Sequence, residues 1–246
     1  MRWWSGLASR PASSYSISAV ATAPRPCRRR SAARRCWVWT SRATSSRRAT
    51  GARAQGLANC RFQEGDACNL HQLADNSFDL VVSIFGAMFA PRPGDVAREM
   101  VRVTRPGGRI VMGNWIPNDP TLVAQVLKIS SAYSPPPPEG FISPMTWGVE
   151  SNVIERFGSA GIPEAHISFT RDTWTFDHPG SPSALLGEFR QFYGPTMNAF
   201  EAADRNGRAD DLSKELDELF HRQNRAAHTD VTCIPATFLR VTVTRT

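Results

Sequence analysis

Hydrophobic residues in the middle of the chain fall in short runs that predict alternating strands and helices. The segment Phe78–Phe85 is apolar on both faces, as expected of an interior strand of a parallel sheet. Residues 95–103 carry apolar side chains at helical spacing, and Asp95 is expected to cap this helix. Strands are expected on either side, at Cys60–Asp66 and Arg109–Gly113. This succession predicts an α/β fold with a doubly wound sheet.

The second half of the chain predicts helices and a late pair of strands. Four segments have apolar residues at helical spacing, and their first apolar positions are Leu122, Val149, Leu185 and Leu212. Between the second and third helices, Ile167 and Phe169 alternate in one parity and Trp174 and Phe176 in the other. A strand with a bulge or break is expected there. The alternating segment Thr237–Thr244 predicts the closing strand.

Positive charge is concentrated at the head of the chain. The 246 residues include 29 Lys and Arg against 22 Asp and Glu, a net charge of +7. Residues 1–54 hold twelve arginines and no acidic residue, so residues 55–246, with 17 basic and 22 acidic side chains, carry a net charge of −5. The overall basic balance therefore gives no indication of a nucleic-acid surface on the folded part.

Composition also bears on membrane, metal and redox chemistry. The longest uncharged apolar run, Leu80–Ala90, is much shorter than the roughly 20 residues that cross a bilayer, so we expect no membrane span. The five cysteines form no CxxC pair, which favours neither a disulfide framework nor a zinc site and suits a reducing, cytoplasmic location. The five histidines lack metal-ligand spacing. We therefore expect no metal and assign no catalytic residue.

Residues 1–54 have an abnormal composition. Ala, Arg and Ser supply 33 of these positions, and four of the seven tryptophans occur among them. Three explanations compete: an acid-free organelle transit peptide, a basic nucleic-acid-binding arm, or translation of a GC-rich gene in the wrong reading frame. We expect this segment to be either disordered or out of frame, and the folded domain to span residues 55–246.

Tryptophan codons allow a test of the reading-frame explanation. Because tryptophan has one codon, a shifted reading of Cys36–Thr40 is forced to give L-G-(V/L/M)-D. With mostly G or C at free third positions, the same shift turns Tyr15–Arg30 into LDLGCGDGTTALPAA and Trp39–Ala54 into DIARNLVEAGNRRAR. The shifted string predicts a strand, a Gly-rich turn, a helix and a second strand that ends in an acidic residue. This order is typical of a nucleotide-type cofactor site. We favour this explanation over the other two.

Three motifs of the body occur in the order and spacing of a known family. They are Gly65-Asp66-Ala67, Ser77–Ser83 and Arg105–Ile110. Together they resemble the landmarks of class I S-adenosylmethionine-dependent methyltransferases, most nearly the branch of the ubiquinone/menaquinone C-methyltransferases. The resemblance covers residues 55 to about 245. It implies a Rossmann-like sheet of strand order 3-2-1-4-5-7-6, parallel with a late antiparallel strand pair, that the body enters at its third strand.

The resemblance extends to the out-of-frame reading. The string LDLGCGDG resembles the Gly-rich cofactor loop of the family, and LGVD resembles its ribose-binding acid. Neither exists in the chain as written, so its first two strands are expected to be lost or degraded. Tyr15–Ala23 and Cys36–Thr40 are nevertheless prone enough to β structure to take their places.

The family pattern assigns a cofactor role to the end of the third strand. Asp66 is placed to accept a hydrogen bond from an adenine amine, while the backbone of Ala67 and Cys68 lies along the ring. The alternative is that Asp66 only caps the following turn.

A second cofactor segment is expected where the central strand ends. Ser83, Ile84 and Phe85 leave that strand at its carboxyl end, where open α/β sheets bind ligands. The alternative for Ile84 and Phe85 is a place in the core.

The resemblance implies methyl transfer from S-adenosylmethionine to a small-molecule acceptor. The cofactor carries the reactive group, so the protein chiefly positions the acceptor against it. The segments Asn114–Trp147 and Ser183–Ala226 are expected to cover the acceptor pocket. Because the Gly-rich loop is absent, we expect impaired cofactor binding. The alternative is a non-catalytic remnant or binding module behind a genuine basic presequence. The motifs specify neither the acceptor nor the oligomeric state.

Overall fold

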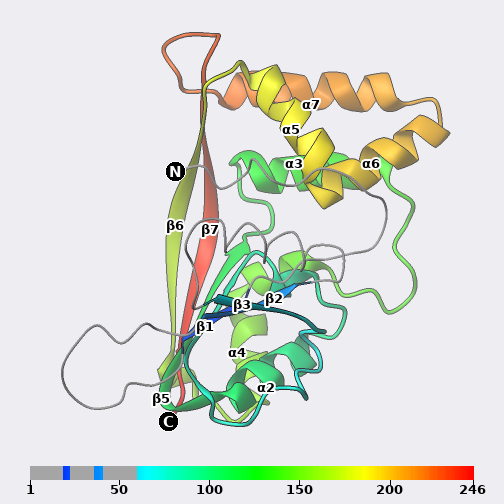
Figure 1. Ribbon diagram of the computed structural model, residues 1–246. Helices are drawn as coiled ribbons and strands as arrows, with labels where there is room; N and C mark the ends of the chain where they lie inside the picture. Colours follow the sequence, from blue (N-terminus) through cyan, green and yellow to red (C-terminus); the bar gives the residue numbers. More distant parts are fainter. Residues whose placement is uncertain (1–18, 23–35, 41–59) are drawn as a thin grey trace. The chain divides into compact units, whose positions relative to one another are not determined.

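The computed structural model describes residues 19–22, 36–40 and 60–246, with side chains from Gly65 onward (Figure 1). The chain divides into two compact units. The described residues of the sheet unit lie within residues 14–115, 141–171 and 239–246, and those of the helical unit lie within residues 116–140 and 172–238. The predicted boundary between residues 54 and 55 lies outside the described residues.

The sheet has seven strands in the order β3-β2-β1-β4-β5-β7-β6. Their bounds are Ala19–Thr22 for β1, Cys36–Thr40 for β2, Cys60–Glu64 for β3, Phe78–Ile84 for β4, Thr104–Trp115 for β5, Ile167–His178 for β6 and Thr232–Thr244 for β7. Strand β2 pairs parallel with β3, and β4 pairs parallel with β5. Figure 1 shows the chain running along β6 and returning along β7. The predicted Rossmann-like order and the late antiparallel pair are confirmed.

Strand β1 corrects the prediction of a parallel sheet in this region. It pairs antiparallel with β2 and with β4, so that Ala19 lies opposite Ser83 and Thr22 opposite Leu80. A parallel crossover usually needs a dozen or more residues with a helix. Residues 23–35, which join β1 to β2, include two prolines and are poorly suited to one. Strands β1 and β2 therefore occupy the expected positions in the sheet, but β1 runs in the opposite direction.

Strand β4 is an interior strand, as predicted. It lies between β1 and β5, with Val81 opposite Ile110. The side chains of Phe78, Val81 and Ile110 are buried. A register shift between Phe78 and Leu80 marks an irregularity in the ladder at the start of the strand. The central strand of the predicted α/β unit is thus present where the hydrophobic run placed it.

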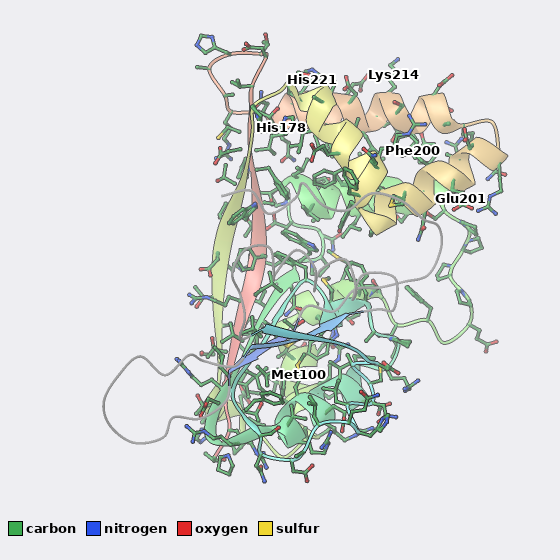
Figure 2. All side chains as sticks on the ribbon, in the orientation of Figure 1. Met100, His178, Phe200, Glu201, Lys214 and His221 are labelled. Atoms are coloured by element: carbon green, nitrogen blue, oxygen red, sulfur yellow. The ribbon has the colours of Figure 1, made fainter. Side chains whose placement is uncertain are left out.

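Helix α2 (Pro93–Val103) connects β4 to β5 and begins two residues earlier than expected. Its N-cap is Arg92 and Pro93 occupies its first turn, so the prediction that Asp95 caps the helix is wrong. Asp95 instead lies in the first turn, where its negative charge is favourable. The apolar face includes Val96 and Met100, both buried, and Figure 2 labels Met100 on this helix.

Short helices complete the sheet unit. They are η1 (Ala87–Phe89), η2 (Pro144–Gly148), α4 (Glu150–Gly158) and η3 (Glu164–His166). Helix α4 confirms the second predicted helix, and its Val153 and Phe157 are fully buried. The ring of Phe157 meets that of Trp147 edge to face, with centroids 6.2 Å apart.

The helical unit is built around aromatic contacts. Its helices are α3 (Leu122–Tyr133), α5 (Pro182–Phe192), α6 (Gly194–Arg205) and α7 (Ala209–Gln223). Phe189 of α5 contacts the rings of Phe176, Tyr193 and Phe220 edge to face, at centroid distances of 5.4, 5.3 and 5.2 Å. Helix α6 contacts α3, α5 and α7. No helix in the described ranges is long and apolar enough to cross a bilayer.

Helix α6 was missed by the hydrophobic pattern, which predicts two helices between residues 183 and 226. It begins with Gly194 and Pro195, and its buried face consists largely of Ala199, Ala202 and Ala203. Phe200 is its one large buried side chain, and the guanidinium of Arg190 lies 4.3 Å from its ring centroid. Small residues bury little area, so they contribute a weak periodic signal.

Strand β6 continues through the position where a bulge or break was predicted. The strand passes from the sheet unit to the helical unit between Arg171 and Asp172. Ile167 is buried within the sheet unit, whereas Phe176 packs on Phe189 in the helical unit and Trp174 is 56% exposed. The parity of the apolar positions therefore changes because Ile167 and Phe176 pack in different units along one strand.

Candidate functional site

The turn after β3 places Asp66 at the carboxyl end of that strand. Its carboxylate Oδ1 accepts a hydrogen bond from the amide of Cys68 at 2.9 Å, and its carbonyl accepts from the amide of Asn69 at 2.9 Å. Asp66 therefore does cap the turn, as the alternative interpretation held. Its other carboxylate oxygen, Oδ2, lies 3.5 Å from the guanidinium of Arg92. The side chain is 54% exposed, so capping leaves room for a ligand at Oδ2.

Ala67 and Cys68 lie beneath this turn rather than on its surface. Both are buried, and the Cys68 thiol points toward the carbonyl of Arg92 at 3.7 Å. Burial raises the pKa of the Cys68 thiol above its usual value, with a smaller contribution from the nearby Asp66 carboxylate. The side chain of Cys68 is thus a protonated packing group, and only its backbone remains available for the predicted contact with an adenine ring.

Two residues of α2 hold the segment that follows Asp66. Arg102 donates hydrogen bonds to the carbonyls of Leu70 and Leu73, each at 2.8 Å. The amide of Leu70 donates to the Glu99 carboxylate, and Glu99 pairs with Arg102 at 2.7 Å. The guanidinium keeps the pKa of Glu99 below its usual value. This Arg102–Glu99 pair fixes the backbone C-terminal to the turn.

Ser83 stabilises the turn between the end of β4 and the start of η1. Its side chain is 1% exposed, and its hydroxyl accepts a hydrogen bond from the amide of Ala87 at 2.9 Å. This bond satisfies a donor at the start of η1, which would otherwise be unpaired. The Ser83 hydroxyl thus shapes the turn, and the atoms that a ligand would meet belong to the residues after it.

Phe85 and Ile84 follow Ser83 in different environments. Phe85 adopts a left-handed backbone with φ of 57°, and its amide donates to the carbonyl of Gly113 at 2.9 Å. Its ring stacks on that of Trp115 with centroids 3.7 Å apart and planes 2° from parallel. Ile84 is 47% exposed and does not belong to the core. An aromatic pair with an exposed aliphatic neighbour therefore marks the carboxyl ends of β4 and β5.

The two candidate segments lie at one edge of the sheet. Strand β3 is parallel to β2, β2 is antiparallel to β1, and β1 is antiparallel to β4. Strands β3 and β4 therefore run in the same direction, so the Asp66 turn and the Ser83–Phe85 segment both follow carboxyl ends. Three strand spacings of about 4.8 Å separate β3 from β4, which gives about 14 Å between the segments. Strand β1 lies between them and ends at the opposite edge, since Thr22 pairs with Leu80.

The described residues form no candidate metal centre. The residues from Gly65 onward include all five histidines, and no group of three or more His, Cys, Asp or Glu with a metal-binding arrangement occurs in the described part of the chain. His178 and His221 lie in the helical unit beside Glu188 and Asp217, respectively (Figure 2). Both histidines therefore have a carboxylate neighbour within their own unit.

Sequence reasoning missed the residues that support the candidate segments. The sequence pattern assigns no role to Arg102 and places Trp115 in a covering segment. Arg102 reaches carbonyls about thirty positions earlier in the chain, and Trp115 extends β5 by two residues beyond the predicted strand. The spacing of Trp115 from Val111 and Gly113 in strand parity could have signalled this extension.

Comparison with known proteins tests the family resemblance. Residues 32–112 match the family model described as a methyltransferase domain. This segment of the chain is therefore similar to a methyltransferase domain. A putative methyltransferase from Bacillus halodurans has a similar fold, with a TM-score of 0.50 and 14% identity over 85% of this chain and 81% of that one. This likeness shows the fold alone.

Two other proteins are similar in sequence to parts of this chain. An uncharacterized protein of Mycobacterium tuberculosis is 35% identical over 146 residues, which is 58% of this chain and 50% of that protein. The chain thus spans about half the length of this relative. The demethylmenaquinone methyltransferase of Paenarthrobacter aurescens is 46% identical over 54 residues, 22% of this chain and 21% of that enzyme.

Proposed function

We propose that the sheet unit is built for S-adenosylmethionine-dependent methyl transfer to a small-molecule acceptor, and that this chain as written binds the cofactor weakly. The methyltransferase-domain match and the two segments at the carboxyl edge support the first part. Asp66 would accept a hydrogen bond from the adenine amine at Oδ2, and the backbone of Ala67 and Cys68 would lie along the ring. Ser83, Ile84 and Phe85 would border the cofactor at the end of β4.

The direction of β1 carries the second part of the proposal. A cofactor loop at the carboxyl edge must follow a strand that ends there. Strand β1 begins opposite Ser83 and ends opposite Leu80, so the residues after it leave from the other edge. The family match also starts at residue 32, after Tyr15–Arg30, whose shifted reading supplies the Gly-rich string. Both observations support the loss of the Gly-rich loop, whereas residues 32–54 lie within the matched range as written.

When bound, S-adenosylmethionine would supply the methyl group as a sulfonium, and the protein would contribute position rather than acid–base chemistry. The Arg102–Glu99 pair would hold the Asp66 turn in place. The Ser83–Ala87 hydrogen bond would present Ile84 and Phe85 toward the ligand. No general base is required of the described residues, because the cofactor carries the reactive group.

Calorimetric titration with S-adenosylmethionine tests the proposal. We expect no saturable heat with the unaltered chain and micromolar binding with a chain whose reading frame is restored across residues 15–54. In the restored chain, Asp66→Asn should weaken binding about tenfold through loss of a charged hydrogen-bond acceptor. Micromolar binding by the unaltered chain would overturn the impairment, and no binding by the restored chain would overturn the cofactor assignment.

A non-catalytic module behind a genuine basic presequence is the second candidate, and the twelve arginines of residues 1–54 are the observation that favours it. Sequencing the source DNA across codons 1–60 separates the two. One base inserted or deleted near each end of the segment supports the garbled methyltransferase. Clean codons with a mature start near Gln55 support the presequence.

A further inference from the structure

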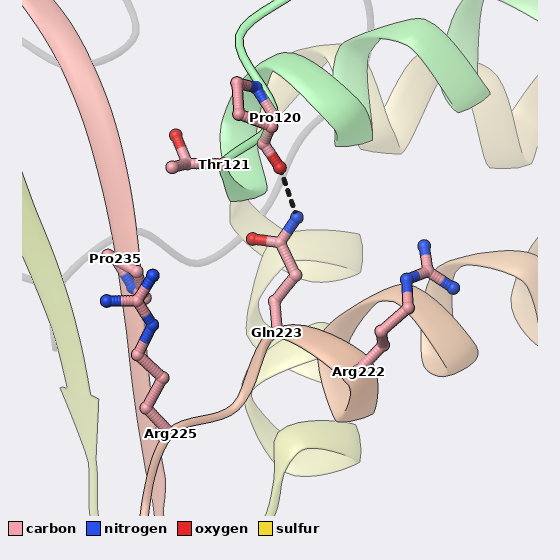
Figure 3. A pocket seen from close by; sticks show the side chains of 6 residues that line it. All are labelled: Pro120, Thr121, Arg222, Gln223, Arg225 and Pro235. Carbon is pink, nitrogen blue, oxygen red and sulfur yellow. Dashed lines mark hydrogen bonds between the residues drawn. The ribbon is translucent and has the colours of Figure 1, made fainter.

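A pocket of about 240 Å³ lies wholly within the helical unit. It is lined by Pro120, Thr121, Arg222, Gln223, Arg225 and Pro235 (Figure 3). In Figure 3, Arg225 lies beside Pro235 on the β7 side, Gln223 lies in the middle and Arg222 lies on the other flank. The walls therefore come from three segments: the residues before α3, the end of α7 and the start of β7.

The pocket is basic and has no carboxylate in its lining. Among the described residues, neither Arg222 nor Arg225 forms an ion pair with an acidic side chain. Arg222 lies in the last turn of α7, where a positive charge is favourable beside the helix C-terminus. Arg225 lies beyond the helix end and has no such explanation.

The backbone that carries Arg225 is held by hydrogen bonds. The amide of Arg225 donates to the carbonyl of Cys233 at 2.9 Å. The neighbouring Asn224 side chain accepts from the amides of Cys233 at 2.8 Å and Ala226 at 3.2 Å, and it donates to the carbonyl of Val231 at 2.9 Å. These bonds fix the position from which the Arg225 side chain enters the pocket.

The other polar groups of the lining are already engaged. Gln223 Nε2 donates to the carbonyl of Pro120 at 2.6 Å, and the Thr121 hydroxyl donates to Asp119 Oδ1 at 2.5 Å while accepting from the amide of Thr237 at 2.8 Å. Asp119 is buried and also accepts from the amide of Thr121, so its carboxylate serves the start of α3. The guanidinium groups are therefore the charged side-chain donors that this lining offers to a ligand.

We propose that this pocket binds a small oxyanion, a carboxylate or phosphate group on a short apolar stem, with Arg225 as its principal anchor. Guanidinium groups present paired N–H donors that match these anions. Pro120 and Pro235 offer apolar walls without amide donors. The volume is below the roughly 300–1,000 Å³ of pockets for drug-sized ligands, which limits the occupant to a few heavy atoms. The site is independent of the methyl transfer proposed above.

Titration of the full chain with inorganic phosphate and, separately, acetate at constant ionic strength tests this proposal. The side-chain Nε–Hε resonance of Arg225, assigned by its loss in Arg225→Gln, reports binding. We expect a saturable shift with at least one of the two anions and at least about tenfold weaker binding in Arg225→Gln. Tighter phosphate binding identifies a phosphate-bearing ligand, and tighter acetate binding identifies a carboxylate.

Lys214→Gln is the matched control. Lys214 is exposed on α7, the helix that carries Arg222, and eight residues place it about 12 Å from Arg222 along the helix axis (Figure 2). Its loss removes the same charge and should leave binding unchanged within twofold. An equal loss in Lys214→Gln, or no saturation at roughly tens of millimolar anion, would overturn the site. If Arg225→Gln does not fold, Arg225→Lys takes its place and should also weaken binding, because an ammonium lacks the paired donors.

Discussion

Phe85 lies face to face on Trp115, with ring centroids 3.7 Å apart and planes 2° from parallel. A bulky residue rarely adopts the left-handed backbone that Phe85 has, with φ of 57°. Its amide is held by the carbonyl of Gly113 on the neighbouring strand. The stack and this hydrogen bond together join the carboxyl ends of β4 and β5, so local backbone strain is retained at the edge where the candidate site lies.

Two substitutions of Phe85 should distinguish the contribution of the aromatic stack to stability from the cost of the backbone strain. We expect Phe85→Ala to lower the free energy of unfolding by about 1–3 kcal/mol, because the stack is lost from a half-buried position. Phe85→Gly loses the same stack but relieves the left-handed conformation, so it should be about 0.5–1 kcal/mol more stable than Phe85→Ala. Urea unfolding measures both. A glycine variant less stable than the alanine variant would contradict the role of strain.

Arg102 should contribute more to stability than a neighbouring arginine of the same helix. Arg102→Gln loses the bonds to Leu70 and Leu73 and leaves Glu99 without its partner, so we expect a loss of about 2 kcal/mol in urea unfolding. Arg98 is 60% exposed and, among the described residues, pairs with Asp95 alone, so Arg98→Gln should cost under about 0.5 kcal/mol. Equal costs would show that the anchoring of the Asp66 turn is energetically unimportant.

The same pair predicts a pH dependence. Arg102 keeps the pKa of Glu99 below its usual value of 4.5, so the folded state holds this proton less tightly than the unfolded chain. The stabilisation is therefore present above about pH 4.5 and is lost as the pH falls through the lowered pKa. Unfolding measured between neutral and acidic pH should show the gap between the native chain and Arg102→Gln closing in this range. A gap that stays constant would exclude the Glu99 contribution.

The strands of the sheet could be predicted from the sequence where burial requires apolar residues in a regular pattern. The apolar run Phe78–Phe85 gave the interior strand, and Leu239, Val241 and Val243 on one face gave the closing strand. Helix α6 could not be found in this way because alanines form its buried face. The direction of β1 was also beyond the pattern, since a four-residue strand alternates identically in either direction.

The candidate site, too, could be predicted from the sequence only in part. The position of Asp66 after β3 and of Ser83 at the end of β4 follows from strand ends and turn residues. The ion-pair partner of Asp66, Arg92, and the hydrogen-bond partner of Ser83, Ala87, do not, because they become neighbours only through the turns that fold the chain back. Phe85 adopts a left-handed backbone, a conformation that sequence propensity disfavours for a bulky residue.

Two adjacent glycines should differ in the cost of a methyl group. A Cβ at Gly108 would lie 2.8 Å from the carbonyl oxygen of Arg105 and 3.0 Å from that of Asp79, so Gly108→Ala forces backbone to move. We expect a loss of about 2–3 kcal/mol in unfolding free energy. Gly107 has free space but φ of 75°, so Gly107→Ala should cost about 1 kcal/mol and Gly107→Asn less. A larger cost at Gly107 than at Gly108 would contradict this packing of β5.

Tyr133 should titrate late because of a carboxylate partner in the helical unit. Its hydroxyl donates to Glu215 Oε1 at 2.6 Å, and this bond raises the pKa of Tyr133 above its usual value of 10.0. The Arg208 guanidinium, 4.3 Å from the ring centroid, acts in the opposite direction but is the weaker influence. Because the folded pKa is raised, the stabilisation is complete below about pH 10 and is lost as the pH rises through the folded pKa.

Phenolate absorbance measures this titration, and Tyr133→Phe assigns it among the three tyrosines. Glu215→Gln should bring the pKa of Tyr133 down toward 10.0, because an amide accepts the hydrogen bond without repelling the phenolate. Asp217→Asn on the same helix removes an equal charge from a carboxylate that pairs with Ser183, so it should leave the Tyr133 titration unchanged. If both variants lowered the pKa equally, the charge of α7 as a whole, rather than the Tyr133–Glu215 bond, would control it.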